Sequence, residues 1–105
     1  MGVMLFTLMS PAIAREINYT GGGQIVSGPG MGGTVRLALT KNGRSVIFYS
    51  GPDRRKSVSL NSSNSVRTSN GTWQFAQCGD YSKKLCVTFK QNKPRRTIRY
   101  LLTKS

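Results

Sequence analysis

Cationic side chains are the most abundant groups in this chain that could do chemistry, and many of them are clustered. The 105 residues include 16 Lys and Arg against three acids and no His, a net charge of +13. Arginine grips phosphate, sulfate or carboxylate through two parallel hydrogen bonds, so clustered cations indicate an anionic partner. The residues predicted to form an anion-binding patch are Arg36, Arg54, Arg55, Lys56, Lys83, Lys84, Lys90, Arg95, Arg96 and Arg99. The alternative is that these runs only keep strand edges solvated and prevent aggregation.

The same composition argues against catalysis. Ser and Thr hydroxyls are plentiful, but the chain has no His to activate one as a nucleophile. The three acids, Glu16, Asp53 and Asp80, each lie in an expected turn or at a terminus with basic neighbours, unlike the paired carboxylates of glycoside hydrolases. We therefore predict a protein that is not an enzyme and uses no cofactor.

A glycine-rich segment carries a misleading motif. Gly28, Gly30 and Gly33 match the spacing of a dinucleotide-binding fingerprint, but the segment that follows alternates like a strand, whereas the fingerprint requires a helix. Pro29 also lacks the amide proton that would bind phosphate. Because glycine is so frequent between positions 21 and 33, we predict a connecting loop there.

Two cysteines, Cys78 and Cys86, predict one disulfide in a chain bound for an oxidising compartment. A metal site is the alternative for a cysteine pair, but with no His and three acids the remaining zinc ligands are lacking. We expect no metal, and a disulfide that stabilises the domain by about 2.5 kcal/mol.

Residues 1–14 have the character of a secretion signal. They are apolar and uncharged, and end in Ala12-Ile13-Ala14, a small-x-small cleavage pattern directly before the charged pair Arg15-Glu16. The run is also too short and interrupted to span a bilayer. A buried N-terminal strand or helix is the alternative. We predict export to the periplasm or the extracellular space, with residues 15–105 forming one small domain.

The elements that must position the cations are predicted to be strands. Apolar residues alternate with polar ones in short runs separated by turn residues, and no stretch shows sustained helical periodicity. The runs are Val35/Leu37/Leu39, Val46/Phe48, Val58/Leu60, Trp73/Phe75, Val87/Phe89 and Ile98/Tyr100/Leu102, with one or two further strands in 15–20 and 24–27. Asn42-Gly43 predicts a type I′ hairpin turn. The fold class is therefore all-β: a small antiparallel meander of seven or eight short strands, forming a barrel or a two-sheet sandwich, with one hairpin disulfide.

Strand parity makes the predicted arrangement more specific. Since successive side chains face opposite sides of a sheet, Arg36 and Arg99 should point outward, as should the apolar pair Ile47 and Tyr49. The Cys78–Cys86 pairing predicts that Phe75 faces Phe89 inside the fold. On the outside it places Gln74 opposite Lys90.

Three kinds of partner follow from these features. The leading hypothesis is an exported binding protein whose basic surface engages an anionic envelope component: lipopolysaccharide, anionic lipid or acidic polysaccharide. The first alternative is a small secreted protein-binding factor, such as an enzyme inhibitor, that uses the glycine-rich loop and the Ile47/Tyr49 surface. The second is nucleic-acid binding, which export and the absence of interleaved aromatic side chains disfavour. At the level of fold alone, a small disulfide-linked barrel is loosely similar to periplasmic enzyme inhibitors and lipocalin-like proteins.

Overall fold

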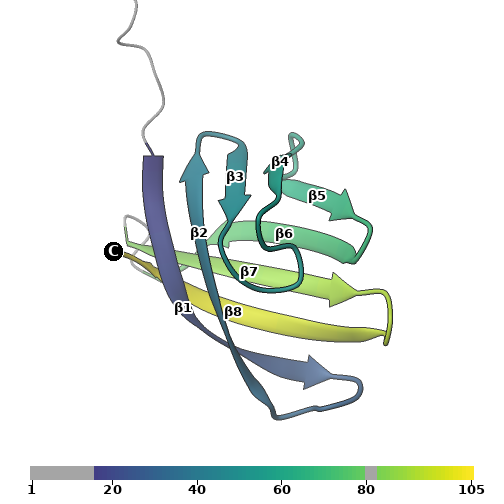
Figure 1. The fold of residues 1–105 in the computed structure, drawn as a ribbon. Coiled ribbons are helices and arrows are strands. Elements are labelled where there is room, and N and C mark those ends of the chain that lie inside the picture. The colour runs from purple at the N-terminus through teal and green to yellow at the C-terminus, as the bar shows by residue number, and fades with distance from the viewer. Residues whose placement is uncertain (1–15, 80–82) are drawn as a thin grey trace, which may run out of the picture.

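Eight antiparallel strands make up the domain (Figure 1). The computed structural model describes residues 16–79 and 83–105, so the predicted signal peptide at 1–14 lies outside the described residues. The described residues form no helix that is long and apolar enough to cross a membrane. The strands are β1 (Glu16–Ser27), β2 (Thr34–Asn42), β3 (Ser45–Phe48), β4 (Ser57–Ser59), β5 (Ser65–Thr68), β6 (Gly71–Gln77), β7 (Lys84–Gln91) and β8 (Arg96–Lys104).

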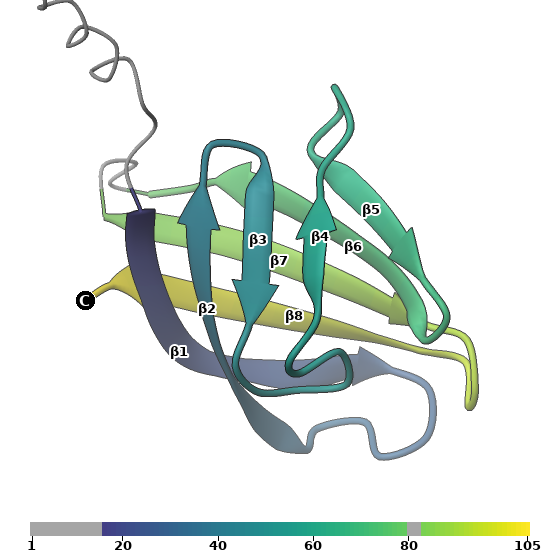
Figure 2. The same ribbon diagram turned by 45° about the horizontal axis from the view of Figure 1, so that its top comes forward.

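The strands form one continuous sheet in the order β4-β3-β2-β1-β8-β7-β6-β5. Strands that follow each other in the chain pair with each other, except β4 and β5, which form the two edges of the sheet. The first and last strands, β1 and β8, also pair. Figures 1 and 2 show β2, β3 and β4 crossing in front of β6, β7 and β8, with the long, curved β1 running from one group to the other. The all-β meander is confirmed, and of the two expected architectures the structure is a nearly closed barrel.

The predicted loop at 21–33 is wrong in its first half. Gly21, Gly22 and Gly23 lie inside β1 and pair with both β2 and β8, so the two expected N-terminal segments are one strand. A β-carbon on Gly21 would collide with the carbonyl oxygen of Leu101, and one on Gly23 would lie 2.8 Å from that of Arg99. Glycine therefore lets β8 approach closely where β1 curves, and packing overrides the usual scarcity of glycine in strands.

Aromatic side chains fill the barrel interior around Trp73, which is fully buried. Its ring lies 4.5 Å from that of Phe48, 4.2 Å from that of Phe89 and 6.1 Å from that of Tyr100, measured between centroids. These residues come from β6, β3, β7 and β8, so one indole joins both halves of the sheet. Burial raises the pKa of the Tyr100 hydroxyl to about 12, because a phenolate would lose its hydration.

One predicted hairpin turn is wrong, and one strand is not among the predicted runs. The β2–β3 hairpin exists, but Asn42 pairs with Ser45, so its two-residue loop is Gly43-Arg44. In that loop only Gly43 has positive φ, at 64°, whereas a type I′ turn requires positive φ at both positions. In addition, the serine- and asparagine-rich segment between Leu60 and Trp73 contains β5, whose single strongly apolar residue, Val66, gave no alternation.

The disulfide prediction is confirmed, but the register built on it is not. Cys78 and Cys86 are bonded, with α-carbons 5.9 Å apart. However, Cys86 pairs with Ala76, while Cys78 lies beyond the end of β6. Phe89 therefore faces Trp73, not Phe75. A shift of two residues leaves every side chain on its expected face, so parity alone does not distinguish the two registers.

Candidate polyanion-binding surface

The ten predicted cations occupy three separate places on the barrel. Because chain direction alternates from strand to strand, the β1–β2, β3–β4, β5–β6 and β7–β8 connections share one end of the barrel, and the β6–β7 connection lies at the other. We name the cations on the outer face of the sheet the flank strip: Arg36, Lys90 and Arg99. Those at the end with four connections form the loop rim: Arg54, Arg55, Lys56, Arg95 and Arg96. Lys83 and Lys84 lie at the opposite end.

The flank strip crosses neighbouring strands on the side of the sheet away from the core. Lys90 pairs with Thr97, so Arg99 is its diagonal neighbour, about 7–8 Å away between α-carbons. Arg99 pairs with Gln24 on β1, and Gly22, two residues earlier, pairs with Arg36 on β2. All three cations are exposed. They therefore form a diagonal row from β7 across β8 and β1 to β2.

Two shallow hollows adjoin this row and share Arg99 as a border. The larger, of about 640 Å³, lies over β1 between β2 and β8. Its lining residues are Gly22, Gly23, Gln24, Thr34, Val35, Arg36, Arg99 and Leu101. The smaller, of about 290 Å³, lies over β6, β7 and β8 and is lined by Thr72, Gln74, Thr88, Lys90 and Arg99. Together they form a groove with cationic borders and neutral polar or apolar walls.

No acidic side chain opposes the flank strip among residues 16–79 and 83–105. The chain has three acids, of which Asp80 lies outside the described residues. Asp53 is fully buried inside the barrel, and Glu16 is at the first position of β1, paired with Asn42. The field over the groove is therefore set by cations, which favours anionic ligands.

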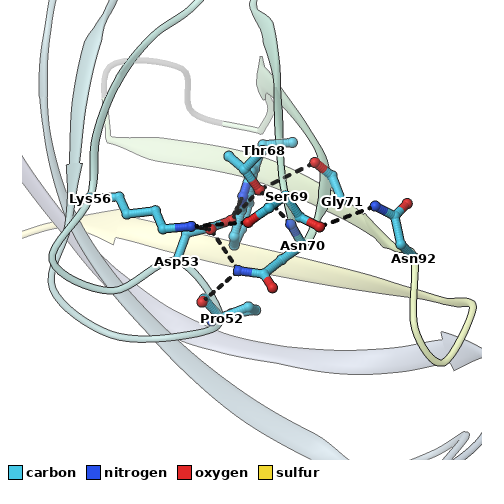
Figure 3. Close-up of polar contacts among 9 residues, drawn as sticks. Pro52, Asp53, Lys56, Thr68, Ser69, Asn70, Gly71 and Asn92 are labelled. Atoms are coloured by element: carbon cyan, nitrogen blue, oxygen red, sulfur yellow. Dashed lines mark hydrogen bonds and ion pairs between the residues drawn. The ribbon is translucent and has the colours of Figure 1, made fainter.

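The loop rim is organised by the buried carboxylate of Asp53 (Figure 3). It accepts hydrogen bonds from Trp73 Nε1 at 2.7 Å, Thr68 Oγ1 at 2.7 Å and Asn70 Nδ2 at 2.8 Å. Lys56 Nζ lies 3.0 Å from it as an ion pair. Burial alone would raise the pKa of Asp53, but these four donors outweigh it and hold the pKa below its usual value. The carboxylate thus holds the β3–β4 loop against β5 and β6.

Contacts among the connections at this end of the barrel leave only some cations of the loop rim free for a ligand. Asn92 donates from its backbone to the Asn70 carbonyl at 3.0 Å, which joins the β7–β8 turn to the β5–β6 turn. Lys56 is engaged by Asp53, and Arg96 donates to Gln91 at 2.9 Å and to the Pro29 carbonyl at 3.3 Å. The side chains that remain exposed without such contacts are Arg54, Arg55 and Arg95.

Lys83 and Lys84 are far from both groups, so the ten residues do not form one patch. At their end of the barrel Lys41, a residue not predicted to function, borders a hollow of about 530 Å³. Burial lowers the pKa of Lys41, and its ammonium donates to the Gly43 carbonyl at 2.7 Å. The ammonium group of Lys41 is therefore already hydrogen-bonded to the backbone.

Sequence reasoning missed the neutral residues of the groove. Gln24, Thr34 and Leu101 line it, and Leu101 is 48% exposed. The glycine-rich composition predicts a loop at Gly22, whereas the residue lies in β1, paired with Arg36 and on the same outer face. Arg67 also lies on the outer face, in the same cross-strand row as Lys90.

Comparison with family models, curated proteins and solved structures finds no match to this chain.

Proposed function

We propose that this chain is an exported, non-enzymatic binding protein whose flank strip engages an anionic component of the cell envelope. The observation that carries the proposal is the convergence of Arg36, Arg99 and Lys90, from three strands, on two adjoining hollows. Basic residues that only solvate strand edges have no reason to border the same groove. A ligand with repeated negative charges would contact all three at once.

Export is supported by two observations of different kinds. A disulfide persists in oxidising compartments and is rare in the cytosol, so Cys78–Cys86 suits a protein outside the cytoplasm. The Ala12-Ile13-Ala14 pattern supplies a cleavage site. Mass spectrometry of protein from its native host should find Arg15 as the first residue. Recovery of intact Met1 on cytoplasmic material would contradict export.

The binding experiment compares three sets of substitutions that each lower the net charge from +13 to +10. The first changes the flank strip to Gln, at Arg36, Lys90 and Arg99. The second changes the exposed rim cations, Arg54, Arg55 and Arg95. The third, a control, changes Arg44, Lys83 and Lys104 at the opposite end. Retention on an anionic matrix and affinity for soluble envelope polymers are measured over a series of salt concentrations.

The flank-strip variant should bind much more weakly and show a shallower dependence of affinity on salt, because fewer counterions are released. The opposite-end control should weaken binding slightly, through net charge alone. Equal losses in all three variants would mean diffuse attraction and would contradict a defined site.

An apolar surface formed by β3 and the residue that follows it supports the alternative of a protein-binding factor. Tyr49 is 58% exposed and Ile47 is 37% exposed, and both point away from the core. The Tyr49 hydroxyl is hydrogen-bonded to Thr40 at 2.9 Å, which holds its ring against the sheet. Substituting both residues with Ser should leave polyanion binding unchanged. If the same variant also loses a protein partner that the wild type captures from envelope extracts, this result supports the protein-binding alternative.

A further inference from the structure

The three consecutive glycines of β1 are not equivalent. Gly21 and Gly23 face the interior, where the backbone and side chains of β8 leave no room for a β-carbon. On Gly22 a β-carbon would meet only the Val35 carbonyl oxygen, at 3.7 Å, an ordinary contact. Packing therefore explains two of the glycines and leaves the third unexplained.

What the missing side chain does at Gly22 is to open the larger hollow. Gly22 is paired with Arg36 on one side and Leu101 on the other, at the centre of that hollow. A β-branched side chain there would stand upright from the sheet and occupy the space between the two arginines. The floor is consequently the backbone of β1 with the exposed Leu101 side chain at its border, and the cations stand at its sides.

The borders offer two kinds of polar group. Arg36 and Arg99 approach β1 from opposite strands, and each presents a planar guanidinium suited to carboxylate. Thr34 and Gln24 are cross-strand partners and expose a hydroxyl and an amide beside the floor. The guanidinium groups match a carboxylate, the neutral donors and acceptors match hydroxyls, and the open floor accommodates a ring. A sugar acid has all three features.

We propose that this hollow binds one hexuronate unit of an acidic polysaccharide. This proposal rests on the proposed function of the flank strip. The ring lies over Gly22, its carboxylate is held by Arg36 and Arg99, and its hydroxyls contact Thr34 and Gln24. The polymer then continues past Arg99 into the second hollow, where Lys90 meets the next carboxylate.

Other polyanions fit these features less well. Single-stranded nucleic acid needs aromatic platforms for its bases, and neither hollow is lined by an aromatic side chain. A lipid bilayer presents a broad surface that would touch the arginine tips and not the floor over Gly22. Inorganic polyphosphate satisfies the cations but leaves the floor, Thr34 and Gln24 without a matching group.

The test uses Gly22→Val, which places a branched side chain on the floor of the hollow without removing charge. Thr20→Val is its matched control, because Thr20 is the next outward residue of β1, is exposed and does not line the hollow. The probes are oligogalacturonate, inorganic polyphosphate of equal charge and vesicles containing anionic lipid. Affinities are measured by calorimetry at one ionic strength for the wild type, both valine variants and the flank-strip variant.

We expect the wild type to bind oligogalacturonate about tenfold more tightly than polyphosphate, and Gly22→Val to lose that preference because its affinity for oligogalacturonate falls about tenfold. The melting temperature of Gly22→Val should equal or exceed that of the wild type, since valine favours strands, which excludes misfolding as the cause. Thr20→Val should behave as the wild type.

Two results would overturn this inference and leave the proposed function standing: oligogalacturonate binding by Gly22→Val as by the wild type, or a loss confined to the lipid vesicles. If the flank-strip variant binds every probe as the wild type does, the proposed function fails as well. The two failures are thus distinguishable in one set of proteins.

Discussion

The indole Nε1 of Trp73 donates a 2.7 Å hydrogen bond to Oδ2 of Asp53, and both side chains are fully buried. Trp73 stands at the centre of the aromatic core, while Asp53 belongs to the loop that carries Arg54 and Arg55. The bond thus connects the core of the barrel to its basic rim. Four side chains from the core and the neighbouring connections converge on this carboxylate. We therefore expect these hydrogen bonds to control both the stability of the fold and the position of the loop that carries Arg54 and Arg55.

Replacing Asp53 with Ala should lower the free energy of unfolding by about 3 kcal/mol or more, because the buried Trp73 indole loses its acceptor, as do the half-buried side chains of Thr68 and Asn70 and the ammonium of Lys56. Urea denaturation followed by Trp73 fluorescence measures it. If the variant does not fold, Thr68→Val provides a milder test with an expected loss of about 1 kcal/mol. Losses within experimental error in both variants would show that the network does not stabilise the fold.

Acid should destabilise the protein through Asp53. Its folded pKa lies below the unfolded value of 3.8, so the ionised carboxylate stabilises the folded state above that pH. This contribution is lost as the pH falls through the lower, folded value, because the unfolded chain then binds more protons. Thermal melting from pH 6 down to about pH 2 should show the loss. Asp53→Asn should flatten the curve, and an unchanged slope in that variant would assign the acid sensitivity to other groups.

The glycines of β1 should respond differently to alanine. Gly21→Ala and Gly23→Ala each introduce a β-carbon into β8 and should cost about 2 kcal/mol. Gly22→Ala, at the open position, should change stability by less than about 0.5 kcal/mol. Denaturation midpoints of the three variants provide the comparison. A destabilised Gly22→Ala would mean that the third glycine is also required by the fold.

Replacing Cys78 and Cys86 together with Ser should lower the free energy of unfolding by about 2–4 kcal/mol while keeping the β-type circular dichroism spectrum. The reason is that the unfolded chain gains freedom when the link is removed. Peptide mapping without reductant should recover the two residues joined. Two free thiols in protein prepared from an oxidising compartment would contradict the disulfide.

The all-β class, the inward-facing residues and the cysteine pair could be predicted because each depends on local pattern. Alternation with a period of two identifies Leu37, Trp73 and Phe89 as core residues whatever their partners, and all three are buried. The same parity placed Arg36 and Arg99 on the outer face. Register was not predictable in this way, since a shift of two residues satisfies the same alternation and replaced Phe75 by Trp73 opposite Phe89.

Only the tertiary structure determines which residues are neighbours in space. The pairing of β1 with β8 joins the two ends of the domain, and it turns Gly21 and Gly23 from an apparent loop into strand residues. It also brings Arg36 and Arg99 to opposite sides of Gly22, a relation between positions far apart in the chain. Asp53 likewise resembled a solvated turn residue, and only the folded barrel surrounds it with Trp73, Thr68 and Asn70. Local pattern determines which face a side chain takes, whereas long-range packing determines its neighbours, and a binding site is made of neighbours.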